Sequence, residues 1–553
     1  MEKWWKERVV YQIYPRSFQD TNGDGIGDIP GIISRLDELK ELGVGIIWLS
    51  PVYKSPGADN GYDISDYYDI NPRFGTMADM DELFVQAGER DIKIVMDLVI
   101  NHTSDEHEWF KKSREPDSLY RDYYIWRPGK PGGKPPNNWT SFFQGSTWEF
   151  DPKSGEYYLH LFDKKQPDLN YRNPKVIDEV KNIMRFWLNR GAAGFRCDAI
   201  NLIYKTSLDD GNWSPVVRGL EHYKSQNGAH RILKELRSDV LDNYDCFTVG
   251  ESHFVDLVDA KLLCDQSRRE LDMLFYFEHL EVDRRITKYI SKKFKADKLL
   301  NVLTKWQQGL EWNAVYLENH NKPRIVSHYG DDSRECWERS AKLLATMLFT
   351  LRGTPFIYQG QEIGMTNFDF TSLDELDDIE SHNVDKLLKK FCVPSSLRWR
   401  WIKESSRDNA RTPMQWNSGE GAGFTRGKPW LGINSNYKKI NYANQQLKEG
   451  SVLNYYKKMI ALRAASETLK YGEFAPAYSH RDVIAYTRTM GAEQYVIILN
   501  FSMNTEEVPL DAIVESASDG SLPKAKIIMS NTDRTSYDDI LSPWEAIVFA
   551  FYK

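Results

Sequence analysis

The 553-residue sequence lacks an excess of basic residues, because 72 Lys and Arg are balanced by 80 Asp and Glu, for a formal net charge of −8. No cluster of Lys and Arg provides the basic face that displaces counterions from a nucleic acid. Long apolar runs are also absent. The longest, residues 343–351, contains Thr346 and Thr350 and falls far short of the ~20 residues of a membrane span. We therefore expect neither a nucleic-acid partner nor a membrane partner.

Cysteine is scarce as well. The five cysteines, at positions 197, 246, 264, 336 and 392, are odd in number and widely spaced, and none forms a CxxC pair. This spacing argues against a disulfide framework or a zinc site. The first residues show no apolar stretch or cleavage site of the secretory kind. These features predict reduced thiols and a cytoplasmic location.

Runs of β-branched and aromatic residues alternate with amphipathic stretches along most of the chain. Continuous apolar runs are typical of parallel strands that are covered on both faces. The stretches between them carry apolar residues at three- and four-residue intervals, as helices do. Eight such units predict an α/β fold, the (β/α)8 or TIM barrel. We expect strands within 9–18, 44–52, 92–100, 194–200, 246–251, 271–277, 312–317 and 354–358, and helices within 32–39, 80–86, 174–188, 232–241 and 341–351.

Two segments depart from this alternation. Residues 104–173 are rich in Trp, Tyr, Pro and Gly, which predicts an irregular domain inserted after the third strand. Residues 472–553 contain short alternating runs, which predict a C-terminal all-β sandwich domain. The barrel would then comprise residues 1–103 and 174–471, with a long excursion near 366–433 after the eighth strand.

Charged side chains stand at the expected C-terminal ends of the strands, where barrel enzymes build their active sites. Asp198 and Glu251 end the fourth and fifth strands, and Asp97 and other polar residues end the third and seventh. A lone acidic residue at a strand end more often caps a helix or faces solvent. Two at neighbouring strands suit glycosyl transfer, in which one carboxylate attacks the anomeric carbon and the other protonates the leaving oxygen. Arg196, two residues before Asp198, would keep that nucleophile ionised.

The chain resembles the α-glucosidases of glycoside hydrolase family 13, close to the bacterial oligo-1,6-glucosidases. The resemblance is carried, in order, by the segments VYQIYPRSF (10–18), DLVINH (97–102), GFRCD (194–198), GE (250–251), NH (319–320) and RDNARTPMQW (407–416). It implies a barrel with an inserted B domain and a β-sandwich C domain. It also implies Asp198 as nucleophile, Glu251 as general acid/base, and retention of the α configuration.

The same resemblance implies a pocket for one terminal glucose, which makes the enzyme exo-acting on short oligosaccharides. Asp59 and Arg407 would clamp the non-reducing glucose, and Tyr62 would stack beneath it. Phe143 and Phe162 would line the pocket, although aromatic residues of the inserted domain can equally belong to its core. The full implied binding set is Asp59, Tyr62, His102, Phe143, Phe162, Gln166, Arg196, Ala199, His320 and Arg407.

The seventh strand departs from the family pattern. The third catalytic carboxylate of the family follows the histidine in Asn-His-Asp, whereas this chain has Asn319-His320-Asn321. Asn321 can hydrogen-bond sugar hydroxyls, but it offers no charge to an oxocarbenium-like transition state, a loss that typically costs ~10²–10³ in rate. Three explanations stay open: an Asp-to-Asn change introduced to trap a substrate complex, a naturally slow hydrolase, and a non-catalytic sugar-binding protein.

Two signals disagree about the bond that is cleaved. Ala199 occupies the position where, in this family, valine accompanies α-1,6 preference and a smaller alanine or a threonine accompanies α-1,4 preference. The segment QPDLN (166–170) nevertheless resembles that of the oligo-1,6-glucosidases. A methyl-sized difference in a pocket is worth only ~1–3 kcal/mol, so we expect mixed activity on maltose, isomaltose and sucrose. A sucrose isomerase or transglucosidase would share most of these motifs.

The segment DTNGDGIGD (20–28) places oxygen ligands at alternate positions. Such an oxygen-rich set suits Ca²⁺ or Mg²⁺, and the family often binds a structural Ca²⁺ here. Gly31 stands where an EF-hand loop would have its closing Glu, so the alternative is a Gly/Asp turn without an ion. We expect no organic cofactor, and a monomer or weak homo-oligomer. The expected ligands are Asp20, Asn22, Asp24, Ile26 (through its carbonyl) and Asp28.

Overall fold

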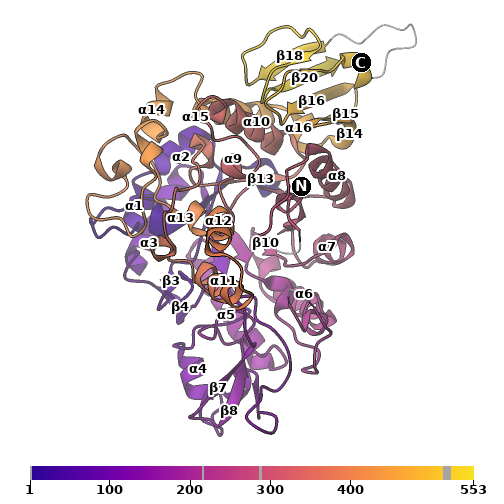
Figure 1. The fold of residues 1–553 in the computed structure, drawn as a ribbon. Coiled ribbons are helices and arrows are strands. Elements are labelled where there is room, and N and C mark those ends of the chain that lie inside the picture. Colours follow the sequence, from indigo (N-terminus) through magenta and orange to yellow (C-terminus); the bar gives the residue numbers. More distant parts are fainter. Residues whose placement is uncertain (1–2, 215–216, 286–288, 515–524, 553) are drawn as a thin grey trace.

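The structure, a computed structural model, describes residues 3–214, 217–285, 289–514 and 525–552 (Figure 1). Its largest sheet has eight parallel strands in the order β11-β10-β9-β5-β2-β1-β13-β12, and β11 and β12 at its two edges lie close together, which nearly closes a barrel. Every strand falls within a predicted segment, so the (β/α)8 prediction is confirmed. The strands are β1 (Val10–Ile13), β2 (Ile46–Leu49), β5 (Lys93–Leu98), β9 (Gly194–Cys197), β10 (Phe247–Glu251), β11 (Met273–Phe275), β12 (Ala314–Val315) and β13 (Thr354–Tyr358).

Helices follow the barrel strands and cover the sheet. α5 shows why they form where they do: Asn173 caps its start, Pro174 occupies the first turn, and Gly191 ends it with φ 120°. The predicted helix over 32–39 is broken into α1 and α2, because the Ser34 hydroxyl donates to the Gly31 carbonyl and competes with the helical pattern. The barrel helices are α1 (Ile29–Ile33), α2 (Leu36–Leu42), α3 (Met77–Glu89), α5 (Pro174–Arg190), α6 (Asn227–Asp239), α7 (Leu257–Cys264), α8 (Ala296–Gly309), α9 (Ile325–His328) and α10 (Trp337–Thr350).

The pairing of β9 with β10 positions the two candidate catalytic carboxylates. Gly194 pairs with Phe247 and Cys197 with Gly250. Gly194 has φ 146°, and a Cβ there would lie 2.1 Å from the Phe247 carbonyl oxygen, so only glycine permits this approach. The next step in the same register places Asp198 beside Glu251 at the C-terminal edge of the sheet.

Two further groups of elements precede α5. A short antiparallel pair, β3 (Tyr53–Lys54) and β4 (Asp66–Ile70), follows β2. Between β5 and α5 lie α4 (Glu108–Ser113) and a three-stranded antiparallel sheet in the order β6-β8-β7, with bounds Trp126–Arg127, Glu156–Leu159 and Trp148–Asp151. In Figure 1 this inserted segment lies at the end of the molecule opposite the C-terminal sheet.

The C-terminal segment is all-β, as predicted. Its five-stranded antiparallel sheet has the order β14-β15-β16-β20-β18, and a two-stranded sheet of β17 and β19 accompanies it in the described residues. Val483, Val496 and Phe549 of the large sheet share an apolar cluster with Leu541 of β19. The strands are β14 (Glu473–His480), β15 (Val483–Met490), β16 (Glu493–Asn500), β17 (Glu506–Glu507), β18 (Ala525–Ser530), β19 (Ile540–Leu541) and β20 (Ala546–Tyr552).

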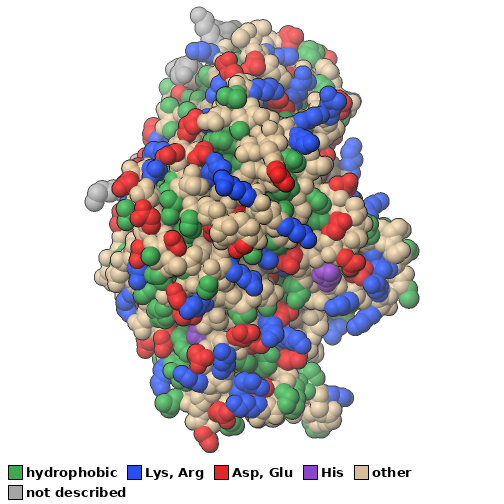
Figure 2. Space-filling model, turned by 90° about the vertical axis from the view of Figure 1, so that its left-hand side faces the viewer, with side chains coloured by type: hydrophobic (Ala, Val, Ile, Leu, Met, Phe, Trp, Pro, Cys, Tyr) green, Lys and Arg blue, Asp and Glu red, His purple; other side chains and the backbone are tan. Residues whose placement is uncertain are grey.

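The excursion after β13 contains a packed pair of helices, α11 and α12, which Figure 1 shows side by side. None of the helices in the described ranges has the length and apolar character that a membrane crossing requires. Figure 2 shows acidic and basic side chains interspersed over one face of the molecule. The remaining helices are α11 (Ile379–Lys390), α12 (Ser395–Ser405), α13 (Asp408–Arg411), α14 (Tyr442–Gln446), α15 (Val452–Ala465) and α16 (Glu467–Tyr471).

A buried carboxyl group after β13 makes stability depend on pH. Glu362 is buried and accepts a hydrogen bond from the Tyr11 hydroxyl at 2.9 Å, and burial raises its pKa to about 7. Because folding favours the neutral acid, the stability that it contributes is present below the unfolded pKa of 4.5 and is lost as pH rises through 7. We expect Glu362→Gln to be more stable than the parent at pH 8 by about 3 kcal/mol, and nearly equal at pH 4. Thermal melts across this range test this, and parallel curves for the two proteins would contradict it.

Candidate active site

A cavity of about 1010 Å³ lies at the C-terminal ends of β9 and β10, between the inserted segment and α11. Three of the thirteen predicted catalytic and binding residues, Arg196, Ala199 and His320, are buried behind its wall. Residues from distant parts of the chain therefore meet at this cavity. The ten that line the cavity are Asp59, Tyr62, His102, Phe143, Phe162, Gln166, Asp198, Glu251, Asn321 and Arg407.

One guanidinium group joins the two candidate catalytic carboxylates. Nη1 of Arg196 lies 2.6 Å from Oδ1 of Asp198, and its Nη2 lies 2.6 Å from Oε2 of Glu251. Because both carboxylates contact terminal nitrogens of the same guanidinium group, they lie close to each other. Arg196 has 1% of its surface exposed, so water does not screen these interactions.

Asp97 completes this cluster, and its role was missed. Its Oδ1 lies 2.7 Å from Nη1 of Arg196, and its Oδ2 accepts a hydrogen bond from the Tyr62 hydroxyl at 3.0 Å. The motif that ends β5 contains Asp97, and its place at a strand end was the available signal. Asp97 therefore holds both the arginine and the aromatic ring that the sequence predicted to bind sugar.

The charges of this cluster are strongly coupled. Burial raises the pKa of Asp97 to about 7, with Arg196 opposing this shift. Burial likewise raises the pKa of Asp198, with Arg196 lowering it and Glu251 raising it. Burial disfavours the charged form of Arg196, yet the three carboxylates outweigh this effect and raise its pKa well above the usual value. The arginine thus stays cationic between the two acids.

His320 offers a neutral hydrogen-bond donor beside the cavity wall. The amide nitrogen of Gln12 donates to Nδ1 of His320 at 2.8 Å, so the ring proton resides on Nε2, which bonds no other described residue. Burial and then Arg196 lower the pKa of His320 well below its usual value. Its ring stacks on Tyr62 with centroids 5.2 Å apart. Nε2 is therefore a buried donor with no hydrogen-bond partner among the described residues.

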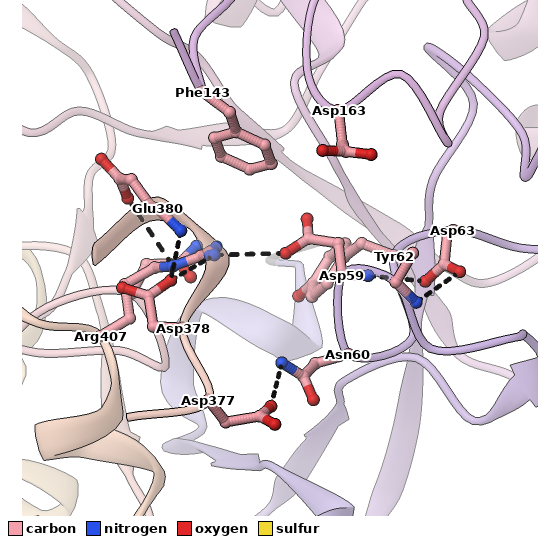
Figure 3. Close-up of polar contacts among 12 residues, drawn as sticks. Asp59, Asn60, Tyr62, Asp63, Phe143, Asp163, Asp377, Asp378, Glu380 and Arg407 are labelled. Atoms are coloured by element: carbon pink, nitrogen blue, oxygen red, sulfur yellow. Dashed lines mark hydrogen bonds and ion pairs between the residues drawn. The ribbon is translucent and has the colours of Figure 1, made fainter. Parts of the chain in front are cut away.

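Arg407 lies among three carboxylates at the other side of the cavity (Figure 3). Its Nη2 is 3.3 Å from Asp59 and 2.7 Å from Asp378, and its Nε is 3.7 Å from Glu380. Asp378 and Glu380 stand at the start of α11, in the excursion after β13, where the sequence analysis selected Arg407 but neither of these acids. Asp59 also accepts from Gln166 Nε2 at 3.3 Å. This arrangement forms a polar clamp with spare acceptor positions for hydroxyl groups.

Aromatic residues of the inserted segment form another wall. The Arg407 guanidinium lies 5.3 Å from the centroid of the Phe143 ring, and Phe162 lies 5.1 Å from the ring of His102. Phe143 and Phe162 also belong to the apolar cluster of the inserted segment, so they are both core and cavity lining. Ala199 belongs to the same cluster and adopts a left-handed conformation, φ 44° and ψ 35°.

Asn321 lines the cavity and contacts a buried cation. Its Oδ1 accepts from Nη2 of Arg411 at 3.1 Å, and Nε of Arg411 donates to the His320 carbonyl. Nη1 of Arg411 lies 3.8 Å from Oδ1 of Asp408. The surroundings of position 321 therefore suit an anionic side chain.

His253 also lines the cavity, although the sequence analysis did not select it. Its Nε2 lies 3.7 Å from Oε2 of Glu251, and its ring stacks on Phe277 with centroids 5.5 Å apart. Burial lowers its pKa to about 4, against the opposite effect of Asp198. A neutral imidazole thus stands beside Glu251, and its position two residues after that acid was the available signal.

The segment 20–28 folds into a loop held by its own side chains. Asp20 accepts from the amides of Gly23 and Gly25, both at 2.8 Å, and Asn22 accepts from that of Asp24. Asp28 caps α1 through the amide of Gly31. In the described part of the chain, no three His, Cys, Asp or Glu side chains are grouped closely enough to hold a metal ion.

Comparisons with known proteins cover nearly the whole chain. Residues 12–472 match the family described as alpha amylase, catalytic domain. The chain is 50% identical to the oligo-1,6-glucosidase of Parageobacillus thermoglucosidasius, with 99% of this chain and 98% of that protein aligned. For the oligo-1,6-glucosidase of Bacillus cereus the identity is 48%, over 99% of this chain and all of the relative.

Solved structures give the same picture. The trehalose-6-phosphate hydrolase of Bacillus licheniformis has a TM-score of 0.93 and 42% identity over the full length of both chains. The isomaltulose synthase of Erwinia rhapontici has a TM-score of 0.94 and 41% identity, again over both full chains. A hydrolase and a sugar isomerase thus share this fold over their full lengths.

Proposed function

We propose, from the premise that the chain belongs to the α-amylase family, glycoside hydrolase family 13, that it is a retaining, exo-acting α-glucosidase of short oligosaccharides. The observation that carries this proposal is the contact of Arg196 with both Asp198 and Glu251, at 2.6 Å each, in one cavity. Two adjacent carboxylates at neighbouring strand ends match the requirement of a double-displacement mechanism.

In the first step, Asp198 attacks the anomeric carbon and the bond to the leaving oxygen breaks. Glu251 gives its proton to that oxygen, and a covalent β-glucosyl-enzyme forms. In the second step, Glu251 takes a proton from a water molecule whose oxygen attacks the same carbon, and Asp198 leaves. Two inversions give glucose with the α configuration. Arg196 opposes the effect of burial on the pKa of Asp198, and so favours its anionic form before the first attack and as it leaves in the second step.

The clamp of Asp59 and Arg407 would hold the hydroxyls at the far side of the glucose, and His320 Nε2 and Gln166 would add further hydrogen bonds. Tyr62 would support the sugar ring. In this proposal the glucose that they hold is the terminal one, and the catalytic pair cleaves the bond at its anomeric carbon. This supports exo-acting cleavage of maltose, isomaltose or sucrose.

Product analysis tests this function. The protein and its Asn321→Asp variant are incubated with maltose, isomaltose and sucrose, and the sugars are separated by chromatography. Release of glucose, with fructose from sucrose, supports the hydrolase. Formation of isomaltulose or trehalulose supports the isomerase alternative, which the similarity to an isomaltulose synthase keeps open. Binding without turnover in both proteins supports a sugar-binding homologue.

Ala199 should influence which bond is preferred. We expect Ala199→Val to raise the ratio of kcat/KM on isomaltose to that on maltose about tenfold, since a methyl-sized contact is worth ~1–3 kcal/mol. A branched residue is strained at φ 44°. Ala199→Thr, which has the same shape and strain, is therefore the matched control and should keep the lower ratio. Equal ratios in the two variants would exclude this role.

We also propose that the loop 20–28 binds a structural Ca²⁺, with Mg²⁺ as the weaker alternative. The oxygen-rich ligand set supports this, and each carboxylate retains acceptor positions beyond its present hydrogen bonds. We expect EDTA to lower the melting temperature by several degrees and Ca²⁺ to restore it. In Asp24→Ala, whose acid lies on the exposed side of the loop, the effect of EDTA should disappear. Identical melting temperatures with EDTA and with Ca²⁺ would contradict the proposal.

The five cysteines are free, and three of them are buried, which supports a reducing, cytoplasmic compartment. We propose a monomer or weak homo-oligomer, which light scattering at several concentrations would test.

A further inference from the structure

The backbones that carry the two candidate catalytic acids separate at the point where the acids stand. The ladder between β9 and β10 ends with Cys197 and Gly250. Beyond it, the Asp198 amide donates to a carbonyl of β5 at 3.0 Å, whereas the Ser252 amide donates to a carbonyl of β11 at 3.3 Å. These backbone hydrogen bonds therefore attach Asp198 and the residue after Glu251 to different strands.

One buried side chain spans the gap between the loops that follow β9 and β10. Asn201 lies three residues after Asp198, in a short 3₁₀-helix (Ile200–Leu202), and is fully buried. Its Nδ2 donates to the His253 carbonyl at 2.8 Å, and its Oδ1 accepts from the His253 amide at 3.0 Å. A single side-chain amide, which offers both a donor and an acceptor, thus satisfies both backbone groups of His253.

His253 connects this pair of hydrogen bonds to the candidate acid/base. It follows Glu251 by two residues, and its Nε2 lies 3.7 Å from Oε2 of that acid. Its ring stacks on Phe277 and lies beside Phe142 of the inserted segment, with centroids 5.5 Å apart in both pairs. The segment 251–253 is therefore held at its backbone by Asn201 and at its ring by two aromatic residues.

The two loops differ in how firmly they are packed. Residues 199–203 are all buried, whereas residues 253–256 are half-buried or exposed. The loop after β10 therefore depends more on Asn201 than the loop after β9 does. Asn201 does not line the cavity, so its side chain can affect a bound sugar only through the position of other residues.

We propose that Asn201 is a positioning residue, which holds the loop after β10 so that Glu251 reaches the leaving oxygen while Asp198 attacks. This inference rests on the proposed α-glucosidase function and assigns a residue to its protonation step. A retaining mechanism needs the two carboxyl groups ~5–5.5 Å apart, and a shift of ~1 Å can cost ~10²-fold in rate. Loss of the Asn201 side chain should displace Glu251 more than Asp198, and so impair protonation more than attack.

Two substrates that differ in their need for a proton test the proposal. Maltose must release a sugar hydroxyl and needs the proton of Glu251, whereas α-glucosyl fluoride releases fluoride, a weak base that needs none. In the Asn321→Asp background, we expect Asn201→Ala to lower kcat/KM on maltose at least ~10-fold more than kcat/KM on α-glucosyl fluoride. Because a loss of folded enzyme lowers both values alike, it leaves their ratio unchanged.

Two further variants separate the proposed role from general damage. Asn201→Asp leaves no cavity and keeps an acceptor for the His253 amide, but it places a carboxylate oxygen against the His253 carbonyl, so it should also lower the ratio of maltose to fluoride activity. Ser225→Ala is the matched control, because the Ser225 hydroxyl is the other side-chain contact of Asn201, at 3.4 Å; this variant should leave the ratio unchanged. An unchanged ratio in both Asn201 variants, whether the two activities fall together or not at all, would overturn the proposal.

The failure of this inference differs from that of the proposed function. If the Asn321→Asp protein cleaves maltose and α-glucosyl fluoride, but the Asn201 variants keep its ratio, only the role of Asn201 is wrong. If the Asn321→Asp protein cleaves neither substrate, the α-glucosidase function is wrong, and the role of Asn201 is wrong with it.

Discussion

Replacing Asp198 by alanine removes the carboxylate that we propose as the nucleophile, and we expect kcat on maltose to fall at least ~10⁴-fold, as when a nucleophile is deleted from other enzymes. The fall in kcat is measured in the Asn321→Asp background, because the higher starting rate expected there allows a larger decrease to be detected. KM should change little, because in the proposed complex Asp59 and Arg407 would hold the glucose independently of the attack.

Azide distinguishes a lost nucleophile from a damaged fold. In Asp198→Ala, azide fills the vacated space, attacks α-glucosyl fluoride once, and should give β-glucosyl azide. In the matched variant Glu251→Ala, the glucosyl-enzyme still forms, and azide should give the α-anomer. If both variants gave the same anomer, the proposed roles of Asp198 and Glu251 would be wrong. Unaltered turnover in Asp198→Ala would show that this residue is not the nucleophile.

Restoring a carboxylate at position 321 has the second-largest expected effect. Asn321→Asp should raise kcat by ~10²–10³, equivalent to about 3–4 kcal/mol of transition-state stabilisation. Arg411 Nη2, 3.1 Å from the amide oxygen, would then pair with an anion that faces the developing positive charge. Initial rates of glucose release from maltose measure the change.

A neutral substitution separates charge from shape. Asn321→Ser keeps a hydrogen-bonding group without charge and should not exceed the rate of the parent protein. An unchanged rate for Asn321→Asp in a pure sample would contradict two hypotheses: that the missing charge at position 321 slows catalysis, and that the Asn was introduced to trap a substrate complex. A rate increase of less than tenfold for Asn321→Asp would indicate that the surrounding residues suit an amide at position 321.

The barrel was predictable because its signal is local. Each buried parallel strand is a continuous apolar run, and the residues that follow it, such as Asp198 and Glu251, fall at one end of the barrel by topology alone. The broken helix at Ser34 was not predictable from periodicity, since a side-chain hydrogen bond to Gly31 decides it.

The site was only partly predictable for a related reason. Asp378 and Glu380 reach Arg407 through the packing of α11, and no local pattern indicates which loop residues a helix will bring to a cavity. The sharing of Arg196 among Asp97, Asp198 and Glu251 depends on burial. The sequence motifs therefore indicated which acids to expect at the site, whereas the interactions among these acids and Arg196 could be recognised only from the structure.

Covalent labelling tests the central claim, that Asp198 and Glu251 act on one sugar carbon, most directly. The Asn321→Asp protein is incubated with 5-fluoro-α-D-glucosyl fluoride, which forms a slowly hydrolysed glucosyl-enzyme, and its peptides are analysed by mass spectrometry. We predict one fluoroglucosyl group on the peptide that contains Asp198, at the side chain of that residue. A label on another carboxylate, or steady hydrolysis of maltose with no label at all, would contradict the account.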